Sequence, residues 1–210
     1  TLIAATLSVA AYTPANNRER ILGNVRQLLT QKINSAISYL NEMRSKVDSL
    51  DEFTGKEKKE IKSELTGYIN FFENKKSEIN TAETREDFSL LVRDMLKKWR
   101  EVILYKESLR GLIITSQFDN IITKAGNLSD RINTKISELE ANTDKTKLVG
   151  LHTNFDAKIS LAEEKISDAR REFKSKNNQK GYNFLAEAKK SLYDAYRILR
   201  NIVWEFRQLM

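Results

Sequence analysis

The sequence predicts an all-α protein made of two three-helix bundle units in tandem. The 210-residue chain contains one proline, Pro14, and seven glycines, so few residues in it disfavour a helix. Lysine, glutamate, leucine, isoleucine and alanine are abundant, and most of these residues favour helices. Apolar residues recur at the spacing of one helix face along most of the chain. With 40% hydrophobic and 31% charged residues, the composition is that of a folded globular protein.

The sequence also repeats itself with a period of about 90 residues, which indicates a duplicated helical unit. Residues 72–79 align with residues 162–169, and the pair Trp99-Arg100 aligns with Tyr196-Arg197. Apolar positions correspond as well, since Ile61, Leu65 and Ile69 fall on Leu151, Phe155 and Ile159. The chain therefore divides into an apolar N-terminal segment over residues 1–17, a first three-helix unit over 18–114 and a second over 115–210.

Three helices are expected in the first unit. The first spans residues 18–49, where apolar residues keep helical spacing. Thr54 and Glu57 form a capping-box pattern that opens a second helix over 55–79. Thr84 and Asp87 open the third helix in the same way. The expected inner face of this third helix consists of Phe88, Leu91, Val92, Met95, Trp99, Val102 and Ile103.

Three further helices are expected in the second unit, near residues 116–141, 145–174 and 181–209. Apolar positions of the middle helix extend from Leu148 to Phe173. The expected inner face of the last helix consists of Tyr182, Leu185, Ala188, Leu192, Tyr196, Leu199, Val203 and Phe206.

The junction between the two units allows two arrangements. Ser116 with Asp119 resembles the start of a new helix, whereas a helix that continues through the junction, as in spectrin-like arrays, is the alternative. Gly111 favours a break only slightly, because a glycine inside a helix costs about 1 kcal/mol. The apolar run at residues 112–114 indicates that the two units pack on one another there.

Residues 1–11 are uncharged, apolar and mostly small, unlike the rest of the chain. This composition is typical of the apolar part and cleavage zone of an export signal. An assembly strand is an alternative, because alternation would place Ile3, Leu7 and Val9 on one apolar face that adds to a partner. A third alternative is a segment that packs on its own bundle or remains unattached. Eleven apolar residues are too few for a transmembrane helix, which needs about 20.

The formal net charge is +7, with basic and acidic residues interleaved in both units. Interleaving is typical of a solvated helical surface, whereas nucleic-acid-binding proteins more often cluster their basic residues. Binding of a polyanion, such as nucleic acid or an anionic cell envelope, is therefore an alternative and not the leading interpretation. The absence of cysteine excludes disulfides, thiolate metal sites and cysteine nucleophiles.

No catalytic or cofactor-binding pattern accompanies the helices. The single histidine, His152, lacks the set of acidic or cysteine residues that indicates a metal site, so a structural role is expected. The sequence contains no Glu-x-x-His pair of the kind found in di-iron bundles, and no glycine-rich phosphate loop after a strand. We therefore expect a protein that is not an enzyme and that holds no metal or cofactor.

Aromatic residues and arginines recur along the third and the sixth expected helix. Large side chains at helical spacing usually belong to a core, but tyrosine, tryptophan and arginine are also enriched at the energetic centres of interfaces. A surface of this composition could also bind a glycan, an anionic polymer or a stacked base. The candidate interaction residues on these helices are Trp99, Arg100, Tyr193, Tyr196, Arg197, Arg200, Trp204 and Arg207.

The second half contains Ala/Lys/Glu-rich helical segments at residues 122–125, 128–132, 135–140 and 186–190. Through these segments, about 90 residues resemble a helical-hairpin repeat module of exported proteins from candidate-phyla bacteria with small genomes. The first half departs from the module, with Phe71, Phe72 and Trp99 in place of small residues. The resemblance implies export and a role in the envelope or outside the cell, and it implies no activity.

The leading hypothesis is a secreted or cell-surface structural protein that self-assembles, or binds a partner, through helix faces and its apolar N-terminal segment. The alternatives are a monomeric extracellular adaptor or adhesin and a polyanion-binding protein, whose binding moderate salt would abolish. The expected partner is a second copy of the chain or another envelope protein. Nucleic acid has weaker support, and no transmembrane span is expected.

Overall fold

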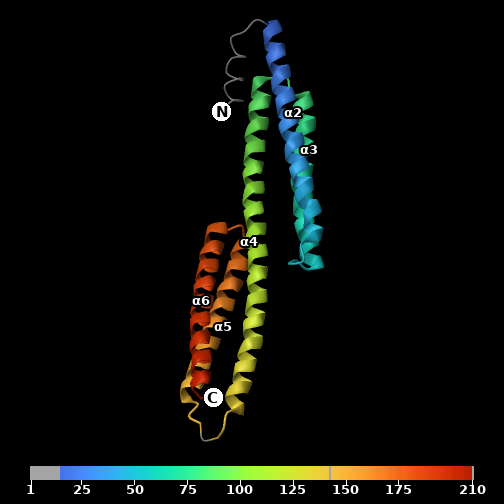
Figure 1. The fold of residues 1–210 in the computed structure, drawn as a ribbon. Helices are drawn as coiled ribbons and strands as arrows, with labels where there is room; N and C mark the ends of the chain where they lie inside the picture. The colour runs from blue at the N-terminus through green and yellow to red at the C-terminus, as the bar shows by residue number, and fades with distance from the viewer. Residues whose placement is uncertain (1–14, 142, 210) are drawn as a thin grey trace. The chain divides into compact units, whose positions relative to one another are not determined.

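The computed structural model describes residues 15–141 and 143–209, and the regular structure in these ranges is helical (Figure 1). Within them the elements are α2 (Ala15–Lys46), the 3₁₀ helix η2 (Val47–Ser49), α3 (Gly55–Thr81), α4 (Arg85–Glu138), α5 (Thr146–Lys174) and α6 (Asn178–Leu209). The predicted all-α class is confirmed. The candidate residues Ile3, Leu7 and Val9 lie outside the described residues.

The chain forms two compact units that divide inside α4, between Ile103 and Leu104. Of the two arrangements expected at the junction, the continuous helix is the one observed, and a separate helix start at Ser116 is wrong. Asp119, which was expected to complete a cap there, pairs instead with Arg170 of α5. Ser116 and Asp119 therefore both lie in the interior of α4.

Phe173 of α5 explains why the second unit begins earlier than the predicted boundary at residue 114. Its buried ring lies so close to Gly111 of α4 and Gly181 of α6 that a Cβ at either glycine would overlap with it. Gly111 therefore permits a close approach and does not break the helix. Leu112 and Ile114, from the run expected to join the two units, pack on this Phe173 cluster of the second unit.

The first unit consists of α2, η2, α3 and the first part of α4. Both predicted capping boxes are confirmed: the side chain of Thr54 accepts from the backbone of Glu57 at the start of α3. At the start of α4, Asp87 Oδ2 accepts from Thr84 N at 2.8 Å and Asp87 N donates to Thr84 Oγ1 at 3.1 Å. Large apolar side chains fill the core of this unit, among them Leu29, Ile33, Leu40, Leu65, Phe72, Ile79 and Phe88.

The second unit is built on a close α5–α6 hairpin that packs beside the second part of α4 (Figure 1). Buried small residues recur one heptad apart on both helices of the hairpin. They are Ala162 and Ala169 on α5, and Gly181, Ala188 and Ala195 on α6. Small residues at a contact allow two helix axes to approach more closely than leucine or phenylalanine does.

These small residues also correct the predicted inner face of α6. The buried positions are Gly181, Leu185, Ala188, Ser191, Ala195 and Ile202, so α6 is rotated from the expected orientation. Tyr196 and Val203, which were expected in the core, are exposed. On α4, Ile103 is likewise exposed instead of buried. Apolar spacing alone misplaced these side chains, because a face of small residues packs more closely than one of large residues.

None of the helices in the described ranges has both the length and the apolarity needed to cross a membrane. The two hairpins differ in packing, since α5 and α6 approach more closely than α2 and α3 do. The internal duplication remains a prediction from the sequence.

Candidate functional site

The exposed face of α6 carries a continuous row of aromatic and basic side chains. Tyr193, Tyr196 and Trp204 are 63%, 57% and 56% exposed. The exposed cations beside them are Lys189, Lys190, Arg197, Arg200 and Arg207. Most members follow one another at intervals of three or four residues, so they share one side of the helix. We call these eight residues the α6 stripe.

The carboxylates of α6 are all engaged by lysines of α5. The paired atoms are Lys147 Nζ and Glu205 Oε2 at 2.6 Å, Lys165 Nζ and Glu187 Oε2 at 3.3 Å, and Lys158 Nζ and Asp194 Oδ2 at 4.0 Å. No other acidic residue occurs in α6. The negative charge of the helix is therefore compensated along its border with α5.

The cations of the α6 stripe have no such compensation. Within residues 15–141 and 143–209, none of its five cations forms an ion pair or a side-chain hydrogen bond. Lys147 Nζ, which pairs with Glu205, also lies 5.2 Å from the centroid of the Trp204 ring. The stripe thus combines uncompensated positive charge with exposed rings, which suits anionic groups and flat ring faces.

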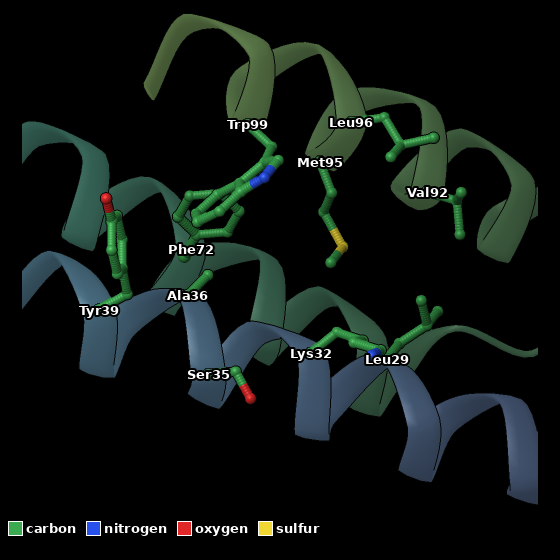
Figure 2. Close-up of a pocket in the computed structure, with 10 residues that line it drawn as sticks. All are labelled: Leu29, Lys32, Ser35, Ala36, Tyr39, Phe72, Val92, Met95, Leu96 and Trp99. Carbon is green, nitrogen blue, oxygen red and sulfur yellow. The ribbon is translucent and has the colours of Figure 1, made fainter. Parts of the chain in front are cut away.

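Trp99 is placed in a different setting, in the wall of a groove of the first unit (Figure 2). Its half-buried ring packs edge-on against Tyr39 of α2 at 5.9 Å and Phe72 of α3 at 6.1 Å between centroids. The groove has a volume of about 510 Å³ and is lined by Leu29, Lys32, Ser35, Ala36, Tyr39, Phe72, Val92, Met95, Leu96 and Trp99. Arg100 lies next to Trp99 in the chain and is exposed.

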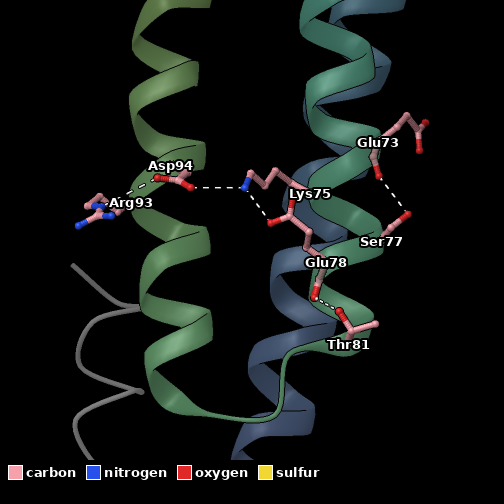
Figure 3. A network of polar contacts seen from close by, with 7 residues as sticks. All are labelled: Glu73, Lys75, Ser77, Glu78, Thr81, Arg93 and Asp94. Carbon is pink, nitrogen blue, oxygen red and sulfur yellow. Dashed lines mark hydrogen bonds and ion pairs between the residues drawn. The ribbon is translucent and has the colours of Figure 1, made fainter.

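Lys75 holds α4 to α3 in the same unit (Figure 3). Its Nζ atom lies 2.7 Å from Glu78 Oε2 on α3 and 3.4 Å from Asp94 Oδ2 on α4. Burial by itself would lower the pKa of Lys75, but the hydrogen bonds to Glu78 and Asp94 outweigh it and raise that pKa. The bridge therefore keeps its charge and fixes α4, which carries one wall of the groove.

His152 has an acidic neighbour that was not recognised in the sequence. Its Nε2 atom lies 2.7 Å from Ser129 Oγ and 3.5 Å from Asp156 Oδ2, and Ser129 Oγ also donates to Asp156. In a serine-type triad the carboxylate holds the ring nitrogen that faces away from the serine. Here one nitrogen faces both groups, so the arrangement joins α4 to α5 without the order of a triad. In the part of the chain that is described, no three His, Asp or Glu residues could hold a metal ion.

The structure gathers six of the candidate residues on α6 and leaves Trp99 and Arg100 in the first unit. Lys189 and Lys190, which extend the stripe, were not among the sequence candidates, and neither were the three α5 lysines that compensate the α6 carboxylates. A signal for the α5 lysines exists in the sequence. Their intervals along α5 equal the intervals of the three α6 carboxylates in reverse order, as antiparallel neighbours require.

In comparisons with known proteins, no family model, curated protein or solved structure matches this chain.

Proposed function

We propose that this protein is a non-enzymatic helical binding protein that holds a polyanionic polymer along the α6 stripe. One observation carries the proposal. The α5 lysines compensate all three carboxylates of α6, which leaves five cations that have no carboxylate partner among the described residues, beside three exposed rings. Uncompensated cations in a row attract polyanions, because binding releases the counterions that the polymer holds.

The shape of the stripe favours an extended ligand. From Lys189 to Arg207 the helix rises about 27 Å, which exceeds the reach of a small anion. Tyr193, Tyr196 and Trp204 offer flat faces to cyclic units, and stacking of a base on an aromatic side chain contributes about 1–3 kcal/mol. The ligand chemistry is therefore a chain of cyclic units that carries negative charge, as in a single nucleic-acid strand or an acidic polysaccharide.

The test measures the affinity of the purified chain for three labelled polymers as a function of salt. Oligothymidylate and oligogalacturonate carry rings and negative charge, whereas polyglutamate carries the charge without rings. We expect both ring polymers to bind more tightly than polyglutamate, with a slope of log affinity against log salt near −3.5 for five contacts to a single strand, at about −0.7 per contact. Absence of salt-sensitive binding to all three polymers would overturn the proposal. If polyglutamate binds as tightly as the two ring polymers, the aromatic side chains of the stripe do not contribute to binding.

A matched pair of variants separates the stripe from the net charge of the chain. Arg197→Gln with Arg200→Gln removes two cations of the stripe, and Lys56→Gln with Lys59→Gln removes two exposed cations of the first unit. We expect the stripe variant to lose about 1.4 from the magnitude of the salt slope and the other variant to keep it. Equal losses in the two variants would mean that binding is not localised on α6.

Secretion and self-association remain proposals that rest on the sequence, and both depend in part on residues 1–17. Light scattering of the chain with and without these residues tests the assembly. A large assembly that the truncation dissolves would support a structural subunit, and two monodisperse monomers would contradict it. Fractionation of the cells that naturally produce this protein tests whether it is secreted.

A further inference from the structure

In the first unit, α4 presents apolar side chains at the spacing of a coiled-coil seam. Val92, Leu96, Trp99 and Ile103, which we call the α4 seam, alternate at intervals of four and three residues. Leu96 and Ile103 are 55% and 46% exposed, while Val92 and Trp99 are half-buried. A seam of this kind normally packs against another helix, but within the described residues its outer half has no covering element.

The α4 seam continues directly into the groove of Figure 2. Val92, Leu96 and Trp99 form the α4 wall, Phe72 of α3 contributes to the lining, and Met95 points from α4 toward α2. The groove has a volume of about 510 Å³, and the α4 seam beside it extends over three helical turns. Grooves of this form take an amphipathic helix whose apolar anchors follow the same spacing.

Cations stand on both sides of this apolar surface. On the α2 side, Lys32 lines the groove, and on the α4 side Arg100 follows Trp99. Both are exposed, and neither forms an ion pair or side-chain hydrogen bond within the described ranges. Arg93 lies seven residues before Arg100, on the same side of α4, and its Nε atom makes only a loose pair at 3.9 Å from Asp94 Oδ1.

We propose that this groove is a docking site for an amphipathic helix of a partner protein, with an apolar seam flanked by carboxylates. The flanking charges of the groove, Lys32 and Arg100, are complementary to such a helix. A second copy would bring its own Arg93 and Arg100 beside the same arginines, and like charges oppose that pairing. A small apolar ligand would leave the exposed Ile103 uncovered. The site lies in the first unit and does not depend on the α6 stripe.

The test uses two designed helical peptides with the same leucine seam. One carries glutamates at the positions that flank the seam, and the other carries lysines there. In the Trp204→Phe variant, Trp99 is the only tryptophan, so its emission reports the groove alone. We expect the glutamate peptide to bind about tenfold more tightly than the lysine peptide and to shift the Trp99 emission, because two surface ion pairs are gained.

Variants of exposed residues test the two parts of the surface without disturbing the core. Leu96→Asp should abolish binding of both peptides, with circular dichroism confirming that the helices persist. Lys32→Glu with Arg100→Glu should reverse the preference, so that the lysine peptide binds more tightly. Arg197→Gln with Arg200→Gln should leave binding unchanged, which separates this site from the α6 stripe.

Several results would overturn the proposal. One is equal binding of the two peptides, and another is the absence of binding by either. Binding of the glutamate peptide that survives Leu96→Asp would place it elsewhere on the chain. If the full chain self-associates and Leu96→Asp abolishes this association, the occupant of the groove is a second copy and not an acidic partner helix.

Discussion

The two helical hairpins use the same type of element and pack it differently. In the first unit, the buried residues of α2 and α3 include large side chains such as Leu29, Leu65 and Phe72. In the second unit, α5 and α6 approach more closely and meet through alanines and glycine such as Ala162 and Ala188. Side-chain size at the contact sets the distance between two helix axes. Larger side chains keep the helices further apart, so a groove can remain between them.

This difference places a groove in one unit and an exposed stripe in the other. Around α2, α3 and α4, large side chains leave a groove of about 510 Å³ with Trp99 in its wall. Against α5, the small residues of α6 turn Tyr196 and Trp204 outward, where they border cations that have no ion-pair partner within the described ranges. Trp99 and Tyr196, which the predicted repeat aligns, are therefore placed differently, since Trp99 lines the groove and Tyr196 is exposed.

The largest expected effect comes from adding the same side-chain volume to each unit. Ala188 is fully buried on α6, so Ala188→Leu overpacks the close hairpin and should lower the free energy of unfolding of the second unit by about 3 kcal/mol. Ala36 lines the groove, so Ala36→Leu has room and should change the stability of the first unit by less than about 1 kcal/mol.

Urea unfolding followed by tryptophan emission measures each unit separately, since Trp99 lies in the first unit and Trp204 in the second. Each substitution is made in the background that keeps only the relevant tryptophan, with the other changed to phenylalanine. Equal destabilisation by Ala36→Leu and Ala188→Leu would contradict the contrast between an open and a closed packing.

A smaller effect is expected from a glycine that packs on Phe173. In Gly111→Ala the new Cβ would overlap with the buried ring, so the free energy of unfolding of the second unit should fall by about 2 kcal/mol. Gly126, also in α4, has no neighbour within 4 Å of an added Cβ. Gly126→Ala should therefore raise stability by about 1 kcal/mol through helix propensity alone. Thermal unfolding of the two variants compares them directly, and a shift of the same sign in both would refute the packing role of Gly111.

Much of the fold could be predicted from local signals. The helices and the capping boxes at Thr54 and Thr84 follow from side-chain spacing and from hydrogen bonds made within one turn. The continuity of α4 could not be fixed, because Ser116 and Asp119 make a good cap when read alone. Gly111, which slightly favours a break, instead packs against Phe173, a residue that is distant in the sequence.

The candidate site was predicted less completely than the fold. Tyr193, Arg197 and Trp204 were recognisable as interaction residues, but periodicity placed Tyr196 in the core. The rotation of α6 depends on alanines, which contribute little to an apolar pattern although they set the closest contact. That the stripe cations lack a carboxylate partner in the described part of the chain depends on ion pairs between α5 and α6, such as that of Lys165 with Glu187, because these pairs occupy the carboxylates of α6.

The pH dependence of the second unit should reveal the polar turn that joins its close hairpin. Lys180 donates a hydrogen bond to Glu172 and lowers the pKa of that carboxyl; burial opposes the shift and a hydrogen bond from Asn177 adds to it. A lowered pKa in the folded state gives stability that is complete above the ordinary carboxyl pKa of about 4.3 and is lost as the pH falls through the lowered value. Glu172→Gln should therefore be less stable than the parent at pH 7 and approach it near pH 3. A difference that stays constant between these pH values would exclude the ion pair as its cause.

The smallest expected effect lies in the same turn, which contains a residue with a positive φ, unlike the connection between α2 and α3. Lys176 has a φ of 61° and follows the end of α5, where Lys176 N donates to Phe173 O and Asn177 N donates to Glu172 O. Glycine adopts this left-handed conformation without the cost of about 1–2 kcal/mol that an L side chain incurs. Lys176→Gly also loses the contact of Lys176 Nζ with the Tyr105 ring at 5.3 Å, which offsets about 0.5–1 kcal/mol. The net gain should be about 0.5 kcal/mol, whereas Lys176→Ala keeps the strain, loses the ring contact and should be less stable than the parent. A chemical unfolding series that ranks glycine below alanine would show that the close hairpin does not depend on the backbone conformation of its turn.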